Sequence, residues 1–300
     1  MKSLNIIGYA KLWVGISTAL IVASLVTFAV LKPNFGIDFT GGSLMEIHVA
    51  NTSNQALHDE LLASGREAVV QSSDADSYFV RLGLVTEEEH QKILADLKLN
   101  HPDLIESKYD AVGPTIGDQL KKDATVAVIV LLGLIAAYIA WAFRKVSEPV
   151  PSWKYGVATL FAAFHDVIIP LGVFAILGRT IGYQIDIAFV AAMLTILGYS
   201  INDTIVVLDR TRENLARYRH ANKSFGEIVN QSIVETLGRS INTTVSTLLP
   251  LVAIFAVGGP TTRPFVLALI VGIVSGAYSS IFFASPLLVL WDSWSRKSKV

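Results

Sequence analysis

The stretch TILGYSINDTIVVLDRTR, from Thr195 to Arg212, places two polar residues in the middle of an apolar helix pattern. The apolar run begins at Ile187 and is long enough to cross a membrane as a helix, which takes about 20 residues. Asn202 and Asp203 lie inside it. A carboxylate near the bilayer centre costs about 2.5–3.5 kcal/mol on insertion scales, so Asp203 is expected to have a partner or a function.

The composition of the whole chain also indicates a membrane protein. Of its 300 residues, 52% are hydrophobic and only 16% are charged. Only Asp166 and Asp203 carry a charge inside the six windows that are long enough to span a bilayer. These windows are residues 12–31, 124–143, 155–178, 187–208, 240–262 and 264–291. We therefore predict an α-helical polytopic membrane protein with six transmembrane helices.

The distribution of Lys and Arg predicts how the chain is oriented. The short loops on one side, together with both termini, carry most of the positive charge, whereas the short loops on the other side hold Arg179 and Arg263. Both termini are thus expected to be cytoplasmic. The first window has no small-x-small cleavage site after it and is predicted to be an uncleaved anchor. The expected parts are 1–32 (N-terminus and first span), 33–122 (outside domain), 123–292 (spans two to six) and 293–300 (cytoplasmic tail).

The outside segment has the pattern of an α+β domain. Strands are predicted at 43–49, 67–71, 78–84 and 104–112, with a polar turn at 72–77 between the middle two. Helices are predicted at 54–64 and after Thr86, where Glu89 stands at capping-box spacing. The order β-α-β-β-α-β is that of a ferredoxin-like domain, which by itself names no activity.

Several function classes are excluded or lack their motifs. The chain has no cysteine, so a disulfide framework, a cysteine-ligated metal and a cysteine nucleophile are ruled out. Its net charge of −1 gives no global field for nucleic acid. The segment Asp38-Phe39-Thr40-Gly41-Gly42 is not a nucleotide-binding loop and is interpreted locally as a turn with permissive glycines. No hydrolase motif is present, and residues 209–219 suit an amphipathic connector or a docking surface.

Arg239 is the first candidate partner for Asp203. It stands at the cytoplasmic end of the following span, which runs antiparallel, and Thr243 and Thr247 share its helical face. The sequence therefore suggests an intramembrane ion pair that is broken when the carboxylate takes up a proton. A static salt bridge between two helices, or an arginine that reaches the headgroups, explains the same residues equally well.

His165 and Asp166 form a second polar pair near the middle of the third span. Histidine titrates near neutral pH, so the pair is a candidate extension of a proton route. A helix–helix hydrogen-bonding pair is the alternative, and from the residues alone it is the favoured one.

The motifs of this chain resemble the SecF family, whose fourth-span signature is similar to Gly198-Tyr199-Ser200-Ile201-Asn202-Asp203-Thr204-Ile205-Val206-Val207. Further segments that look like the family are Phe39-Thr40-Gly41-Gly42, Val112-Gly113-Pro114, His165-Asp166, Asp209-Arg210, Arg212-Glu213-Asn214, Arg239-Ser240-Ile241-Asn242-Thr243-Thr244 and Gly276-Ala277-Tyr278-Ser279-Ser280-Ile281. The resemblance covers nearly the whole chain.

This resemblance implies an accessory subunit of bacterial Sec protein export in the inner membrane, driven by the proton gradient and without a cofactor. It places Asp203 and Arg239 at the intramembrane proton site, with Asn202, Thr243 and Thr247 beside them. The implied partners are SecD, the SecYEG channel, the translocating preprotein and membrane lipid, with YajC as a further candidate. Two rival functions remain open at this point: half of a proton-coupled small-molecule exporter, and a scaffold subunit of the translocon that transports nothing.

Overall fold

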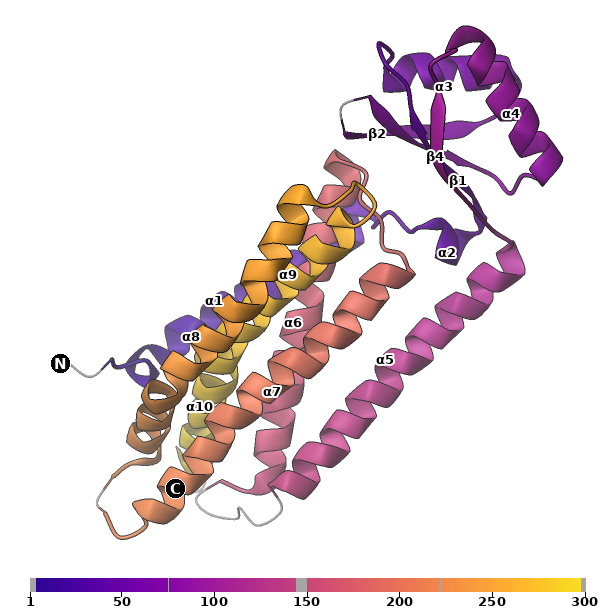
Figure 1. The fold of residues 1–300 in the computed structure, drawn as a ribbon. Coiled ribbons are helices and arrows are strands. Elements are labelled where there is room, and N and C mark those ends of the chain that lie inside the picture. The colour runs from indigo at the N-terminus through magenta and orange to yellow at the C-terminus, as the bar shows by residue number, and fades with distance from the viewer. Residues whose placement is uncertain (1–3, 75, 144–149, 222, 298–300) are drawn as a thin grey trace. The chain divides into compact units, whose positions relative to one another are not determined.

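A computed structural model describes residues 4–74, 76–143, 150–221 and 223–297 of the chain (Figure 1). The chain divides into two compact units. The first contains Met1–Lys32, Val128–Val173 and Ala191–Val300, and the second contains Pro33–Ala127 and Phe174–Val190. The second unit thus holds the predicted outside domain together with the connection between the third and fourth spans.

Six helical runs are long and apolar enough to cross a membrane. In chain order they are η1 (Ile7–Tyr9) with α1 (Ala10–Leu31), α5 (Pro114–Ala142), α6 (Ser152–Thr180), α7 (Ile187–Arg217), α8 (Phe225–Val257), and α9 (Arg263–Ser279) continued by η2 (Ser280–Ala284) and α10 (Ser285–Lys297). Each predicted window overlaps one of these runs, so the prediction of a multi-pass helical protein is confirmed.

Three of the spans extend well beyond their apolar windows, and the first of them, α5, already begins at Pro114. Helix α7 continues to Arg217, so the predicted connector at 209–219 is mostly helix, and α8 begins at Phe225. The first turn of α8 is closed by a capping box, in which the Ser224 hydroxyl accepts from the Glu227 amide at 3.3 Å and the Glu227 carboxylate accepts from the Ser224 amide at 2.7 Å. The apolar window marks the stretch that suits lipid, whereas caps decide where the helix ends.

Internal prolines and a π-helical turn occur in some of the spans and not in others. Pro170 lies inside α6 and Pro250 inside α8, where each removes a backbone hydrogen bond, whereas α7 has no proline. The sixth span contains the π-helical turn η2, which begins at Ser280. Such turns are rare and are frequently found at functional sites.

Glycines bring α9 close to α7 within the first unit. A Cβ on Gly272 would clash with the Ile196 side chain, and a Cβ on Gly276 would lie 2.8 Å from the Cβ of Ser200. This four-residue glycine spacing is a known way for membrane helices to approach closely. It places Ser200 of α7 directly against α9.

The second unit contains the four-stranded antiparallel sheet with order β2-β3-β1-β4. Its elements are α2 (Ile37–Thr40), β1 (Gly42–His48), α3 (Asn54–Ala63), β2 (Ala68–Asp74), β3 (Ser77–Leu82), α4 (Glu87–Asn100) and β4 (Ile105–Val112). Helices α3 and α4 lie together on one face of the sheet (Figure 1) and close a core with Met45, Ile47, Leu57, Val80 and Ile93. The predicted β-α-β-β-α-β domain is confirmed.

A helix cap and a tight strand pairing fix two element ends in this domain. The capping box of Thr86 and Glu89 is present, with the Glu89 carboxylate 2.8 Å from the Thr86 amide. The hairpin between β2 and β3 is tighter than predicted, because β2 continues through the polar residues to Asp74, which pairs with Ser77. The predicted turn at 72–77 is therefore largely strand, with residue 75 outside the described part.

A short pairing attaches the start of the outside domain to the connection between α6 and α7. The Gly36 amide donates to the Ile185 carbonyl at 2.9 Å, and the Ile185 amide donates to the Asn34 carbonyl at 2.8 Å. Arg81 of β3 donates to the Asn34 side-chain oxygen at 3.1 Å. The sheet and the segment that leads into α7 therefore belong to one unit.

Candidate functional site

Asp203 lies at the meeting point of three helical elements of the first unit and is 7% exposed. The Ser240 hydroxyl of α8 donates to its Oδ1 at 2.7 Å, and the Ser280 hydroxyl, at the start of η2, donates to its Oδ2 at 3.0 Å. Each carboxylate oxygen thus accepts one hydrogen bond from a serine hydroxyl. Among the described residues, no lysine or arginine forms an ion pair with Asp203.

The predicted pair of Asp203 with Arg239 is not formed in this structure. Neighbouring residues of an α-helix point about 100° apart, and it is Ser240 that faces Asp203 while Arg239 is exposed. Asn202 and Thr243 are also exposed, and the Thr247 hydroxyl donates to the Tyr199 hydroxyl at 3.4 Å. The predicted site is therefore divided, with its carboxylate inside the bundle, Arg239, Asn202 and Thr243 on the surface, and Thr247 half-buried.

His165 and Asp166 are fully buried and lie among serines of the neighbouring helices. His165 Nδ1 is 2.9 Å from Asp166 Oδ1, which also accepts from the Ser275 hydroxyl at 3.1 Å. Asp166 Oδ2 accepts from the hydroxyls of Ser200 and Ser279. The carboxylate therefore joins α6, α7 and α9, as both the relay and the structural interpretations of this pair require.

Three polar atoms in this part of the bundle are buried without a partner among the described residues. They are His165 Nε2, Thr204 Oγ1 and Thr244 Oγ1. A buried polar group without a hydrogen bond costs about 1–3 kcal/mol. Such a group marks a position where water, an ion or a changed side-chain arrangement would complete the contacts.

The motif from Asp38 to Gly42 has a second role beside its turn. Asp38 Oδ2 accepts from the Ile187 amide at 2.9 Å, so this side chain caps the first turn of α7. Asp186 Oδ1 accepts from the Phe189 amide at 2.7 Å in the same turn. Burial raises the pKa of Asp186 above its ordinary value and outweighs the hydrogen bond from Phe189, which lowers it, while the nearby charge of Asp38 adds a smaller rise.

The remaining motif residues shape the backbone. Gly41 and Gly42 have φ values of 69° and 123°, which a glycine adopts most easily. The Thr40 hydroxyl donates to the Gly36 carbonyl at 3.1 Å, and the Phe39 ring lies 6.4 Å from that of Phe35. The expectation of permissive glycines is therefore confirmed, while the cap on α7 was not foreseen.

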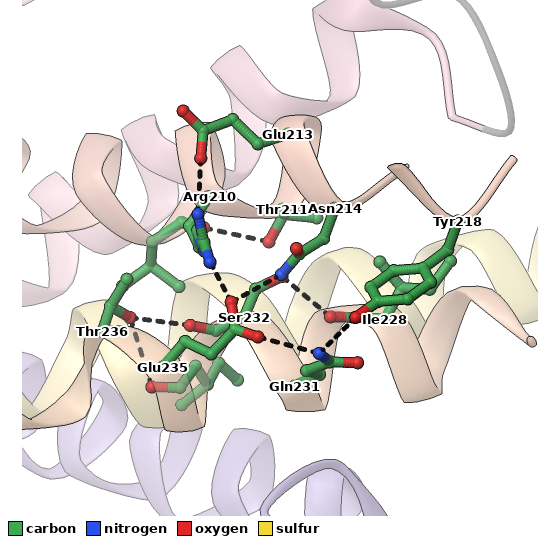
Figure 2. Close-up of polar contacts among 12 residues, drawn as sticks. Arg210, Thr211, Glu213, Asn214, Tyr218, Ile228, Gln231, Ser232, Glu235 and Thr236 are labelled. Carbon is green, nitrogen blue, oxygen red and sulfur yellow. Dashed lines mark hydrogen bonds and ion pairs between the residues drawn. The ribbon is translucent and has the colours of Figure 1, made fainter. Parts of the chain in front are cut away.

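A polar network joins α7 and α8 near their predicted cytoplasmic ends (Figure 2). Arg210 Nε lies 2.5 Å from the Glu235 carboxylate, and a second guanidinium nitrogen lies 2.8 Å from Glu213. The Asn214 amide donates to the Ser232 hydroxyl at 3.0 Å and to Glu235 at 2.9 Å. The residues predicted as a connector therefore hold two helices together.

Asn214 is the buried centre of this network, so its removal is expected to lower stability. Asn214→Ala removes the donor to the buried Ser232 hydroxyl and one of the donors to Glu235, which keeps Arg210, and losing such a bond in a buried place costs about 1–3 kcal/mol. The midpoint of thermal unfolding in detergent should fall by about 2–4 °C for each kcal/mol. Asn242→Ala, at an exposed amide of α8, is the matched control and should leave the midpoint unchanged. Equal midpoints for both variants would contradict the role of the network.

The serines around the two carboxylates were not predicted as site residues. They are Ser200, Ser240, Ser275, Ser279 and Ser280. A usable signal existed, since Ser275 and Ser279 are four residues apart in an apolar span and Ser200 lies one turn before Asp203. Among the described residues, no group of three or more His, Asp or Glu side chains is arranged to hold a metal ion.

Comparisons with known proteins assign a family to this arrangement. A family model described as "Protein export membrane protein SecD/SecF, C-terminal" matches residues 92–294, and the "SecD/SecF GG Motif" matches residues 26–52. The chain is 37% identical over 298 residues to "Protein translocase subunit SecF" of Anaerolinea thermophila, covering 97% of this chain and 94% of that protein. It is 39% identical over 268 residues to "Protein translocase subunit SecDF" of Thermus thermophilus, covering 87% of this chain and 35% of that protein.

Solved structures give the same result. A crystal structure of SecDF from Thermus thermophilus matches with a TM-score of 0.86 and 35% identity, over 97% of this chain and 39% of that chain. SecDF in a super-membrane-facing form matches with a TM-score of 0.72 and 35% identity, over 100% of this chain and 40% of that chain. The chain thus spans about two fifths of the solved SecDF proteins.

Proposed function

Because the chain belongs to the SecD/SecF family of protein-export membrane proteins, we propose that it uses the proton-motive force to promote late, ATP-independent preprotein translocation and release. It does so without enzymatic chemistry of its own, as a multi-pass protein of the inner membrane with both termini in the cytoplasm. The observation that carries the proposal is Asp203, a buried carboxylate in an apolar bundle whose observed partners are two hydroxyls.

The surroundings of Asp203 suit a proton better than a fixed ion pair. Serine hydroxyls both donate and accept, so they adapt to a charged or a protonated carboxyl by rotating. A permanent ion pair would instead need a cation beside the carboxylate, and Arg239 is exposed. Each elementary charge that crosses 100 mV releases about 2.3 kcal/mol, which is comparable to the cost of rearranging one intramembrane polar contact.

The exposed polar residues favour a second membrane protein as a partner. Asn202, Arg239 and Thr243 lie on the surface of spans that cross lipid, where uncovered polar groups are costly. The SecDF relative of Thermus thermophilus carries a longer chain, of which this sequence covers 35%. We infer that a SecD partner covers this surface and that Arg239 acts there, approaching Asp203 when the helices shift.

The second unit provides a route for movement. Asp38 caps the first turn of α7, and Gly36 and Asn34 are bonded to Ile185 just before that turn. Helix α7 continues from this turn to Asp203. A shift of α7 that follows protonation is therefore transmitted to the outside domain, which acts as a lever on the preprotein emerging from the SecYEG channel. YajC is a further candidate partner.

The proposal is tested by preprotein export into inverted membrane vesicles that contain SecYEG and SecD, with or without this chain. After ATP is removed, completion of a trapped translocation intermediate is measured with and without an imposed proton gradient. Completion that needs both the chain and the gradient supports the proposal. Completion that needs the chain but ignores the gradient favours a scaffold, and ligand-dependent proton flux without preprotein favours a small-molecule exporter.

A further inference from the structure

We propose that the His165–Asp166 pair and its three serines form a second proton-holding site, which exchanges protons with Asp203 along paired serines. The inference rests on the proposed proton-coupled function and adds a step to it. Asp166 and His165 are both 0% exposed, so neither reaches the surface of the bundle directly. Any proton that reaches them passes through neighbouring side chains or water.

The site is built from donors on three helices. Ser275 and Ser279, one turn apart on α9, donate to different oxygens of Asp166 at 3.1 and 2.7 Å. Ser200 of α7 donates to the second of these oxygens, and His165 Nδ1 lies 2.9 Å from the first. The three serine contacts stabilise a charged carboxylate, and His165 adds a fourth when its Nδ1 carries a proton, which makes this a prepared site rather than an isolated acid in an apolar span.

The same two helices also reach Asp203. On α7, Ser200 bonds Asp166 and Asp203 follows one turn later. On the sixth span, Ser279 donates to Asp166 and the adjacent Ser280 donates to Asp203 at 3.0 Å. The regular helix changes to the π-helical turn η2 between these two serines. Two neighbouring hydroxyls of the sixth span therefore contact one carboxylate each, which places the two acids next to adjacent positions of the same helical run.

The balance of charge indicates that a proton is held here. The titratable groups that face Asp166 are His165 of α6, which also packs its ring 5.9 Å from Tyr278 of α9, and Asp203 of α7, which is connected through the serines. No described lysine or arginine pairs with either carboxylate. Because a buried charge without a countercharge is very costly, a proton bound between His165 and Asp166 would lower the cost of burying this carboxylate.

The unpartnered nitrogen of His165 supports transfer over a static role. His165 Nε2 is buried without a hydrogen bond among the described residues, although Nδ1 is fully engaged. A histidine that only fixes two helices is expected to satisfy both nitrogens. A proton would be delivered to or accepted from His165 at Nε2, the ring nitrogen that no described residue occupies. In the predicted orientation, Asp166 lies one helical turn farther toward the outside than Asp203.

The test uses the chain reconstituted with its SecD partner in liposomes, with infrared difference spectra recorded during a pH change and proton flux followed by a trapped dye. The native chain should show protonation signals from two carboxyl groups, of which Asp166→Asn removes one and Asp203→Asn removes the other. Ser279→Ala keeps both acids but removes one contact, and it should slow proton flux about tenfold or more, as expected for a lost hydrogen bond to a charged group.

Two controls make the result decisive. Ser279→Thr retains the hydroxyl and should restore the flux, whereas Ser293→Ala, at an exposed serine of α10, should leave it unchanged. An unchanged carboxyl signal in Asp166→Asn, or native flux in Ser279→Ala, would overturn the second site. If proton flux survives in Asp203→Asn, the proposed proton-coupled function itself fails, so the two failures are distinguishable. Flux that follows sodium at constant pH would also overturn the proton site.

Discussion

Asp203→Asn is expected to abolish gradient-dependent completion of export while the protein still inserts and folds. The amide has nearly the shape of the carboxylate, and the Ser240 and Ser280 hydroxyls can rotate to accept from it. The variant therefore keeps its packing but cannot take up a proton. In the vesicle assay, the gradient-stimulated component should fall to the level seen without the chain.

The controls for this variant separate charge from proton exchange. Asp209→Asn removes an acid from the same helix, at an ion pair with Arg212 whose side chains are 42–43% exposed, and should export normally. Asp203→Glu keeps a titratable group and should retain part of the activity. Full gradient-dependent export by Asp203→Asn would show that the carboxylate is structural and would assign the motor to a partner chain.

Gly42→Ala is expected to produce the second largest effect, by distorting the start of the outside sheet. Gly42 has φ of 123°, and a Cβ there would lie 2.7 Å from the Leu82 carbonyl oxygen on the paired strand. Backbone strain of this kind costs about 1–3 kcal/mol, and the forced displacement of backbone adds about 1–3 kcal/mol. Protease protection of the outside domain, measured in the full chain during heating, should be lost at a lower temperature.

Gly83→Ala is the matched control for this variant. Gly83 lies beside Leu82, has no positive φ, and an added Cβ meets no atom within 4 Å. In the Gly83→Ala variant, the outside domain should therefore keep the same protease protection during heating as in the native chain. If both alanine variants had equal protection, the requirement for glycine at position 42 would not come from the geometry of the sheet.

The architecture was predictable where a local signal agreed with the global fold. The outside domain followed from alternating strands and from the capping box of Thr86 and Glu89, and the sheet order confirms it. The spans followed from their apolar windows. The full lengths of α7 and α8 did not follow from these windows, because hydropathy detects only the lipid-facing stretch. Helix α7 continues past its window to Arg217, and α8 begins before its window at Phe225.

The candidate site was predictable only in part. Asp166 and Asp203 stand out because a carboxylate is costly in lipid. Serine causes no such conflict, because its hydroxyl can bond to its own helix backbone. The spacing of Ser275 and Ser279 marks a polar helix face, but sequence does not show which acid that face meets. The choice between Arg239 and Ser240 as the neighbour of Asp203 depends on the rotation of α8, which a single sequence does not fix.

The placement of proline in the spans has a mechanical consequence. Helices α6 and α8 are continuous but contain Pro170 and Pro250, each of which removes a backbone hydrogen bond and favours bending, whereas α7 has no proline and covers roughly 24 Å from Ile187 to Asp203 at 1.5 Å per residue. Helix α7 is therefore expected to bend less easily than α6 and α8. Under the proposed proton-driven mechanism, α7 is expected to move as one piece, while α6 and α8 are expected to bend at their prolines.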